Sequence, residues 1–181
     1  MRAPSTRMTG DSGPAVRATV RAMVLDRDER VLLQAYLDPT VHGHDRAPHT
    51  TPVWIAPGGG LRPGEDAAAG LARELAEETG LVDLAWGAWL WSRSVDLRYQ
   101  GRWRRFEERY RLGRVAAARP AVAPAALEEH ERSVLLGHRW WTLDDLLATR
   151  ETIYPPRLAQ RLAAVLGADP PAEAIDISAD G

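Results

Sequence analysis

Residues 59–81, GGLRPGEDAAAGLARELAEETGL, combine a glycine-rich loop with a segment dense in Ala, Leu and Glu. The segment from Glu65 to Thr79 is composed mainly of strong helix formers. Pro63 and Gly64 precede it and Gly80 follows it, and these residue types commonly begin and end helices. A helix over 65–79 is therefore predicted, with a tight loop in front of it.

The predicted helix concentrates acidic side chains on one side. At about 3.6 residues per turn, Glu74, Glu77 and Glu78 fall within a narrow arc, where each like-charged pair weakens a helix by about 0.2–0.5 kcal/mol. Either the carboxylates point into solvent, or a divalent cation such as Mg²⁺ holds them together. The glycine-rich loop favours the cation, because its backbone can approach a ligand or metal closely.

Strands and helices alternate along the rest of the chain. Two strand-like runs separated by a short polar turn predict an early hairpin, and two helical stretches near the end carry a Thr cap or flanking Pro and Gly. This mixture predicts an α/β or α+β layered domain. The expected strands lie at 15–26, 30–37, 53–55, 82–92 and 103–116. A Pro- and Ala-rich connection on the surface is expected at 116–133, and the two later helices at 143–150 and 155–167.

Length and composition predict one folded domain with flexible ends. The 181 residues are 45% hydrophobic, enough for one buried core. Segments 1–14 and 168–181 are rich in Pro, Gly, Ser, Asp and Ala, and are expected to be a flexible lead-in and a disordered tail around a domain at 15–167.

Charge and residue usage exclude several classes of function. With 23 basic and 25 acidic residues, the net charge of −2 argues against binding to a nucleic acid polymer or an anionic membrane. All the basic residues are Arg, and Cys is absent, which excludes Lys Schiff bases, thiolate nucleophiles, disulfides and Cys-based zinc sites. No apolar signal segment or run of about 18 apolar residues is visible, so a cytoplasmic location is expected.

The whole stretch from 59 to 81 resembles the signature of the Nudix hydrolase family. That signature specifies Gly, five residues, Glu, seven residues, Arg-Glu, an aliphatic, any residue, Glu-Glu, any residue, Gly and an aliphatic. Both gaps have the required length, and every specified position is met, over a resemblance that extends to about residues 15–167. The matching residues are Gly59, Glu65, Arg73, Glu74, Leu75, Glu77, Glu78, Gly80 and Leu81.

This resemblance implies a fold, a reaction and a set of roles. The implied fold is an α/β/α sandwich with a mixed β-sheet and a loop-helix-loop catalytic motif. The implied reaction is Mg²⁺- or Mn²⁺-dependent attack of water on a diphosphate linkage in a nucleoside diphosphate derivative. In the family's terms Glu74, Glu77 and Glu78 are the metal-binding and catalytic carboxylates, the carbonyl of Gly59 or Gly58 adds a ligand, and Glu65 pairs with Arg73 to support the loop.

The general base is left open among several carboxylates. A metal lowers the pKa of the attacking water, and a nearby carboxylate can then accept its proton. Glu74 is the first choice, although in the family the base can also come from a loop outside the signature. The candidates outside it are Glu107, Glu108, Glu128, Glu129 and Glu131.

Substrate contacts are less well specified. The segment from Arg98 to Arg114 holds seven arginines interleaved with aromatic residues. Arg105 and Arg109 are candidates for binding phosphate oxygens, and Trp141 for stacking on a base; the alternative is an amphipathic strand with arginines in water. A His-x-His pair lies in the loop at 42–49, but no third metal ligand is evident there, and the role of this loop is unassigned.

Two classes of function remain from the sequence. The first is a hydrolase of a small nucleotide derivative, such as a nucleoside triphosphate, an oxidised nucleotide or ADP-ribose. The second is a Nudix-fold sensor that binds such a ligand without cleaving it, although a complete set of signature glutamates favours the hydrolase. The isomerase chemistry known on this fold needs a cysteine that is missing here. Many relatives are dimers, so a homodimer is one expected state.

Overall fold

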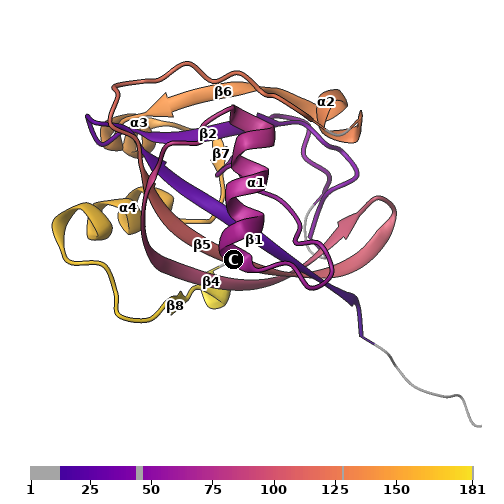
Figure 1. The fold of residues 1–181 in the computed structure, drawn as a ribbon. Coiled ribbons are helices and arrows are strands. Elements are labelled where there is room, and N and C mark those ends of the chain that lie inside the picture. Colours follow the sequence, from indigo (N-terminus) through magenta and orange to yellow (C-terminus); the bar gives the residue numbers. More distant parts are fainter. Residues whose placement is uncertain (1–12, 44–46, 128, 181) are drawn as a thin grey trace, which may run out of the picture.

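The strands of the chain form one curled, mixed β-sheet, flanked by helices on both faces (Figure 1). The computed structural model describes residues 13–43, 47–127 and 129–180. Within these ranges the strands are β1 (Ala15–Leu25), β2 (Val31–Tyr36), β3 (Val53–Ile55), β4 (Ala85–Tyr99), β5 (Arg102–Arg114), β6 (Leu135–Trp141), β7 (Thr152–Ile153) and β8 (Ile175–Asp176). The helices are α1 (Ala67–Thr79), α2 (Glu129–Val134), α3 (Leu143–Ala148) and α4 (Leu158–Gly167), and a 3₁₀ turn covers Ser178–Asp180.

The strand order is β7-β3-β2-β1-β5-β4-β8, and β6 pairs with the other side of β2. The long β4–β5 hairpin and the β1–β2 hairpin are antiparallel, whereas β1 and β5 run parallel. β1 and β2 separate beyond their turn, and the 57–61 loop takes the vacant edge of β1, with the Val20 N–H donating to the Gly59 carbonyl at 3.0 Å. This split in the sheet brings the glycine loop beside β1.

The predicted helix is present and begins two residues later than expected. Asp66 has an extended backbone, and its side chain accepts hydrogen bonds from the N–H groups of Ala68 and Ala69. It is therefore the N-cap rather than a residue of the helix. Gly80 ends the helix at φ 73°, a conformation that favours glycine.

Alternation along β1 divides the core into two parts. Val20, Ala22 and Val24 pack on α1, through Leu71 and Leu75. The odd-numbered side chains point to the other face. There Met23 and Leu25 pack toward α3 and α4, which lie across the sheet from α1 (Figure 1). Sheet and helices thus form the predicted α/β/α sandwich.

The end of the chain differs from the expected disordered tail. β8 pairs in parallel with β4, and the Ile177 N–H donates to the Ser92 carbonyl at 2.8 Å. Ile177 is only 3% exposed and packs in the core beneath α4. Its burial supplies a hydrophobic contact that the polar composition around it does not suggest. The expected flexible lead-in at 1–14 lies almost wholly outside the described residues.

None of the helices in the described ranges is both long and apolar enough to cross a lipid bilayer.

Candidate active site

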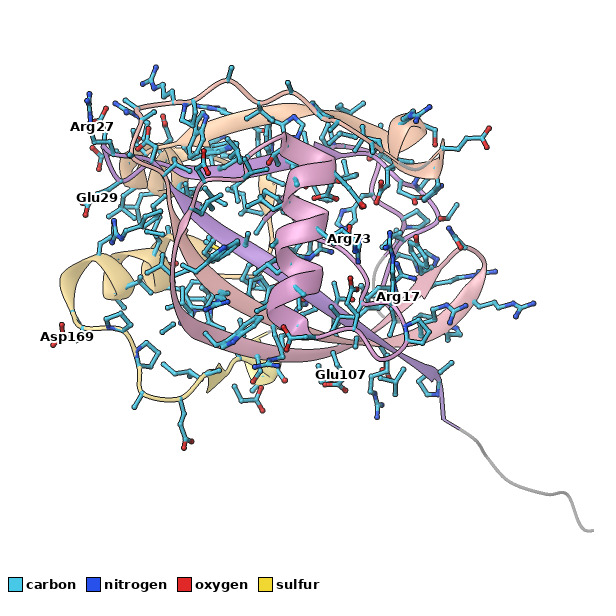
Figure 2. The ribbon with its side chains drawn as sticks, viewed as in Figure 1. Arg17, Arg27, Glu29, Arg73, Glu107 and Asp169 are labelled. Atoms are coloured by element: carbon cyan, nitrogen blue, oxygen red, sulfur yellow. The ribbon has the colours of Figure 1, made fainter. Side chains whose placement is uncertain are left out.

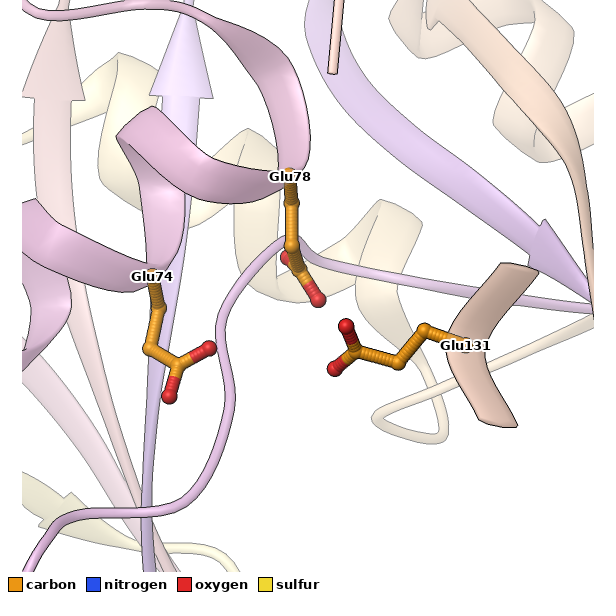
Figure 3. A group of neighbouring side chains, drawn as sticks. All are labelled: Glu74, Glu78 and Glu131. Atoms are coloured by element: carbon orange, nitrogen blue, oxygen red, sulfur yellow. The ribbon is translucent and has the colours of Figure 1, made fainter. Parts of the chain in front are cut away.

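Three carboxylates from two distant segments converge at the C-terminal half of α1. Glu74 and Glu78 lie one turn apart on its buried side and are 8% and 2% exposed. Glu131 approaches them from α2 (Figure 3). One oxygen from each carboxylate lies within 4.8 Å of the others. Such a spacing of hard oxygen donors fits one divalent cation, because bare anions repel each other at this distance.

The glycine loop shapes the cluster. The Gly58 N–H donates to Glu78 Oε2 at 2.7 Å, and the Tyr36 hydroxyl donates to Glu78 Oε1 at 3.2 Å. At Gly59, an added Cβ would lie 2.4 Å from Glu74 Oε2, so only glycine leaves room for this carboxylate. The Gly58 carbonyl accepts a hydrogen bond from Arg21, and the Gly59 carbonyl accepts from Val20. Both carbonyls proposed as ligands therefore already have protein donors.

Arg73 connects the loop to the helix. Its guanidinium makes two 2.8 Å hydrogen bonds to the Glu65 carboxylate, from Nε and Nη2, and Nη1 donates to Glu74 Oε1 at 2.8 Å. This fork is the paired geometry expected for these two residues. It holds the pKa of Glu65 down at about 2, through the Arg73 hydrogen bonds and the Arg62 N–H. Arg73 thus orients Glu74 and ties it to Glu65.

Glu77 lies outside the cluster. Its Oε2 accepts from Arg73 at 3.1 Å, its Oε1 lies 3.6 Å from Arg62, and its side chain is 32% exposed. It is therefore not one of the three converging carboxylates, and its expected part in metal binding stays a prediction. The physical reason is that positions 74 and 78 share a helix face more closely than either does with 77, at 3.6 residues per turn.

Burial disfavours the ionised forms of the clustered carboxylates. It raises the pKa of Glu78 to about 7, against the opposing effects of Arg21 and the Gly58 N–H. Burial likewise raises the pKa of Glu74, with Arg73 acting in the opposite direction. A bound cation would supply the missing positive charge and favour the ionised forms of both.

One prediction follows for the metal-free protein. The pKa of Glu78 in the folded protein lies above the ordinary value of 4.5. Protonation of Glu78 therefore favours the folded state, and this contribution to the free energy of unfolding is greatest below pH 4.5 and is lost as the pH rises through 7. Glu78→Gln keeps the shape without the charge. It is expected to raise the free energy of unfolding by up to about 3 kcal/mol at pH 8 and to change it little at pH 4.5. Urea unfolding with EDTA at both pH values measures this.

Glu129→Gln is the matched control for that experiment, since Glu129 is exposed on α2. Its unfolding free energy should follow the wild type at both pH values. If the unfolding free energies of Glu78→Gln and the wild type depended on pH in the same way, burial of an ionised Glu78 would not be the cause of the pH dependence.

Of the carboxylates outside the signature, Glu131 alone is brought to the cluster among the described residues. The positioning of α2 depends on the loop after β2: His130 Nε2 lies 2.9 Å from Asp38 Oδ2, and the Leu37 N–H donates to the Val134 carbonyl at 2.9 Å. The Pro- and Ala-rich connection therefore ends in a helix that is anchored beside the site.

The other expected bases lie elsewhere. Glu107 is exposed, accepts a hydrogen bond from Ser94 and lies at the edge of the molecule (Figure 2). Glu108 is buried and bound to Arg93 and Tyr110. Glu129 is exposed, and Glu128 lies outside the described residues.

A cavity of about 520 Å³ opens beside the cluster, a size typical of small-molecule sites. Its wall includes the glycine loop, Glu78 and Glu131, and its floor is the concave face of β1, β5 and β4. Apolar side chains line much of it, and three arginines reach it, Arg17, Arg21 and Arg93. A diphosphate at the carboxylates therefore has space beside it for an attached group.

The three residues expected to contact substrate do not line this cavity. Arg105 and Arg109 lie on the exposed face of β5, where Arg105 pairs with Asp96 at 2.8 Å and Arg109 stacks on Trp89. Trp141 is 1% exposed within the core against Trp54, which corrects its expected stacking on a base. Strand alternation explains this, because β5 turns 106, 108 and 110 inward and 105 and 109 outward.

The cavity arginines were missed because they are spread over β1 and β4 rather than concentrated in one segment. The alternation of Arg17, Thr19 and Arg21 along β1 was the available signal. In the histidine loop, His42 and His49 line the cavity, whereas His44 lies outside the described residues.

The NUDIX domain family model matches residues 15–162. The chain belongs to the NUDIX family. The resemblance to Nudix hydrolases, first indicated by the signature at 59–81, is thereby confirmed, as is the Nudix fold. No curated protein matches the chain in sequence.

Several solved structures share this fold at low sequence identity. A NUDIX hydrolase from Nitrosomonas europaea is 19% identical, with a TM-score of 0.57 over 84% of this chain and 89% of that one. An Ap4A hydrolase from C. elegans is 17% identical, with a TM-score of 0.56 over 84% and 98%. The E. coli dihydroneopterin triphosphate pyrophosphohydrolase is 17% identical, with a TM-score of 0.56 over 85% and 99%.

Proposed function

We propose that this Nudix hydrolase depends on a divalent metal, Mg²⁺ or Mn²⁺, and cleaves a diphosphate linkage in a nucleoside diphosphate derivative by attack of water at phosphorus. The observation that carries the proposal is the convergence of Glu74, Glu78 and Glu131 at the wall of a nucleotide-sized cavity. The names of the Ap4A hydrolase and the dihydroneopterin triphosphate pyrophosphohydrolase, two solved structures of the same fold, support a substrate that contains linked phosphate groups.

The chain's own residues divide the work. Glu74 and Glu78 would hold the metal, which when bound neutralises the diphosphate and lowers the pKa of water. Arg73 keeps the Glu74 carboxylate oriented by its 2.8 Å hydrogen bond. Glu131 is our choice for the group that accepts the proton of the attacking water, because it reaches the cluster from a separate element, α2, outside the helix that carries Glu74 and Glu78. Glu74, the first choice from the sequence, is the less suited base since Arg73 stabilises its ionised form.

Arg17 is suited to bind a phosphate group. Its guanidinium lies above the Tyr99 ring, 5.3 Å from the centroid, and close to Gly60, where an added Cβ would meet Arg17 Nη2 at 2.6 Å. Among the described residues it has no carboxylate partner. Arg17 and Arg73 lie on the same side of α1 (Figure 2), and Arg73 also reaches the Gly60 carbonyl, at 3.4 Å. A phosphate at the cluster would therefore meet a free cation.

The proposal is tested with a panel of nucleoside triphosphates, oxidised nucleotides, ADP-ribose, dinucleoside polyphosphates, NADH and nucleotide sugars. We expect release of phosphate, pyrophosphate or a nucleoside monophosphate from at least one of them, only with Mg²⁺ or Mn²⁺ and not with EDTA. Binding without turnover across the panel would instead support the sensor. The cytoplasmic location and the homodimer stay predictions from the sequence.

A further inference from the structure

The helix α2 brings Glu131 to the carboxylate cluster but adds no side chain to either part of the core. It has six residues, all of them among the described ones, and none of their side chains is buried. A helix this short is unstable alone, and most helices in proteins depend on the packing of an apolar face. Polar contacts must therefore hold α2 beside the active site.

The two ends of α2 are attached in different ways. Its C-terminal end continues into β6, and the Val134 carbonyl accepts a hydrogen bond from the Leu37 N–H at 2.9 Å. Its N-terminal end follows the Pro- and Ala-rich connection and is attached through a side chain, because His130 Nε2 lies 2.9 Å from Asp38 Oδ2. The His130 ring also meets the Tyr99 ring edge-on, with 6.1 Å between the centroids. His130 is therefore a point at which the first turn of α2 meets the rest of the fold.

The loop after β2 fixes the orientation of Asp38. Asp38 Oδ1 accepts from the Thr40 N–H at 2.8 Å and from the Thr40 hydroxyl at 2.6 Å, and Oδ2 is the oxygen that faces His130. The Asp38 side chain is only 9% exposed, so water competes little for this contact. The same loop is joined to β4, since the backbones of His42 and Arg98 exchange two hydrogen bonds, of 2.8 and 3.3 Å. Asp38 thus offers α2 a partner that is tied to both β2 and β4.

The contact of His130 also fixes the direction of its neighbour, Glu131. Successive side chains of an α-helix lie about 100° apart around the helix axis. When His130 points at Asp38, the resulting rotation of α2 turns Glu131 toward the carboxylate cluster (Figure 3). A catalytic group misplaced by about 1 Å can cost about 10²-fold in rate. The position of α2 therefore matters for any chemistry that Glu131 performs.

We propose that Asp38 is a positioning residue, which through His130 holds Glu131 in the orientation needed to accept the proton of the attacking water. The role of Glu131 as the base rests on the proposed function, whereas the anchoring of α2 does not. The Asp38 carboxylate acts on the reaction only through His130. Loss of this contact should therefore lower kcat by misplacing Glu131.

Two substitutions in the full chain break the same contact from opposite sides. Asp38→Ala and His130→Ala should each lower kcat about 10–100-fold on the best substrate of the panel, and the double variant should be no slower than the slower single one. In a Glu131→Gln background, Asp38→Ala should change kcat by less than about twofold, because no base is left to misplace. Asp176→Ala is the matched control and should retain the wild-type kcat. Asp176 accepts from the Ser178 N–H at 2.9 Å and from its hydroxyl at 2.6 Å, in a turn like that of Asp38, but it lies outside the cavity.

Amide hydrogen exchange tests the anchoring of α2 without any turnover. With EDTA and no substrate, residues 129–134 should exchange about tenfold faster in Asp38→Ala and His130→Ala than in the wild type, while the rate for residues 67–79 stays unchanged. Unchanged exchange over 129–134, or a further fall in kcat of about tenfold when Asp38→Ala is added to Glu131→Gln, would overturn the proposal. If the wild type turned over no substrate while exchange over 129–134 still accelerated in both variants, the hydrolase would be refuted and the anchoring of α2 by Asp38 would stand.

Discussion

Glu78→Gln is expected to lower kcat/KM by about 10²–10³-fold at saturating Mg²⁺. Glu78 is 2% exposed and held by the Gly58 N–H and the Tyr36 hydroxyl, so its carboxylate has one fixed orientation toward the cluster. Gln can keep both contacts but offers the metal no negative charge. Steady-state kinetics on the best substrate of the panel, over a range of Mg²⁺ concentrations, measure the effect.

Loss of folding does not explain that outcome, because the same substitution is expected to stabilise the metal-free protein at pH 8. In the wild type, Mg²⁺ at 100 times its Kd should raise the unfolding free energy by about 2.7 kcal/mol, and this increment should shrink in Glu78→Gln. Glu107→Gln makes the same charge change at an exposed position of β5 and should retain wild-type activity. Turnover of Glu78→Gln within a factor of three of wild type would remove Glu78 from the metal centre.

Glu131→Gln is expected to lower kcat by about 10²–10⁴-fold, the usual contribution of a general base. Its carboxylate reaches the cluster from α2, which is anchored through the His130–Asp38 contact of 2.9 Å. The affinity for Mg²⁺ should change much less than kcat, and the acidic limb of the pH–rate profile should be lost. Stopped assays of kcat across pH 5–9, together with Mg²⁺ titrations, separate these effects.

Glu129→Gln, two residues away on the same short helix but exposed, is the matched control and should keep both kcat and the pH profile. If Glu131→Gln instead weakened Mg²⁺ binding as strongly as Glu78→Gln, Glu131 would be a ligand and the base would be sought again in Glu74.

The elements close to the signature were predictable because their structure depends on neighbours in the chain. The helix, its glycine end and the facing positions of Glu74 and Glu78 follow from periodicity and capping. The strands of both hairpins were likewise recognised from their composition, although β4 continues to Tyr99, well beyond the expected end at 92. Its extra length comes from pairing with β5, which a propensity pattern does not report.

The residues predicted to contact the substrate were wrong because their orientation depends on strand pairing and not on the local sequence. Arg105 and Arg109 look like phosphate ligands in a run of arginines, but β5 turns both outward and turns Glu108 inward. Arg17 and Arg93 reach the cavity because β1 and β4 flank β5 in the sheet. Which arginines face a ligand is therefore decided by strand register and not by local abundance.

By itself, then, the sequence determined the family, the sandwich of strands and helices, and the two glutamates one helical turn apart, because each of these depends on spacing within a short segment. The tertiary structure alone decided that Glu131 joins Glu74 and Glu78 in the cluster, that Ile177 closes the core, and that Arg17, Arg21 and Arg93 reach the cavity. These three features depend on contacts between segments far apart in the chain. Sheet register and packing determine such contacts, and neither produces a periodic pattern in the sequence.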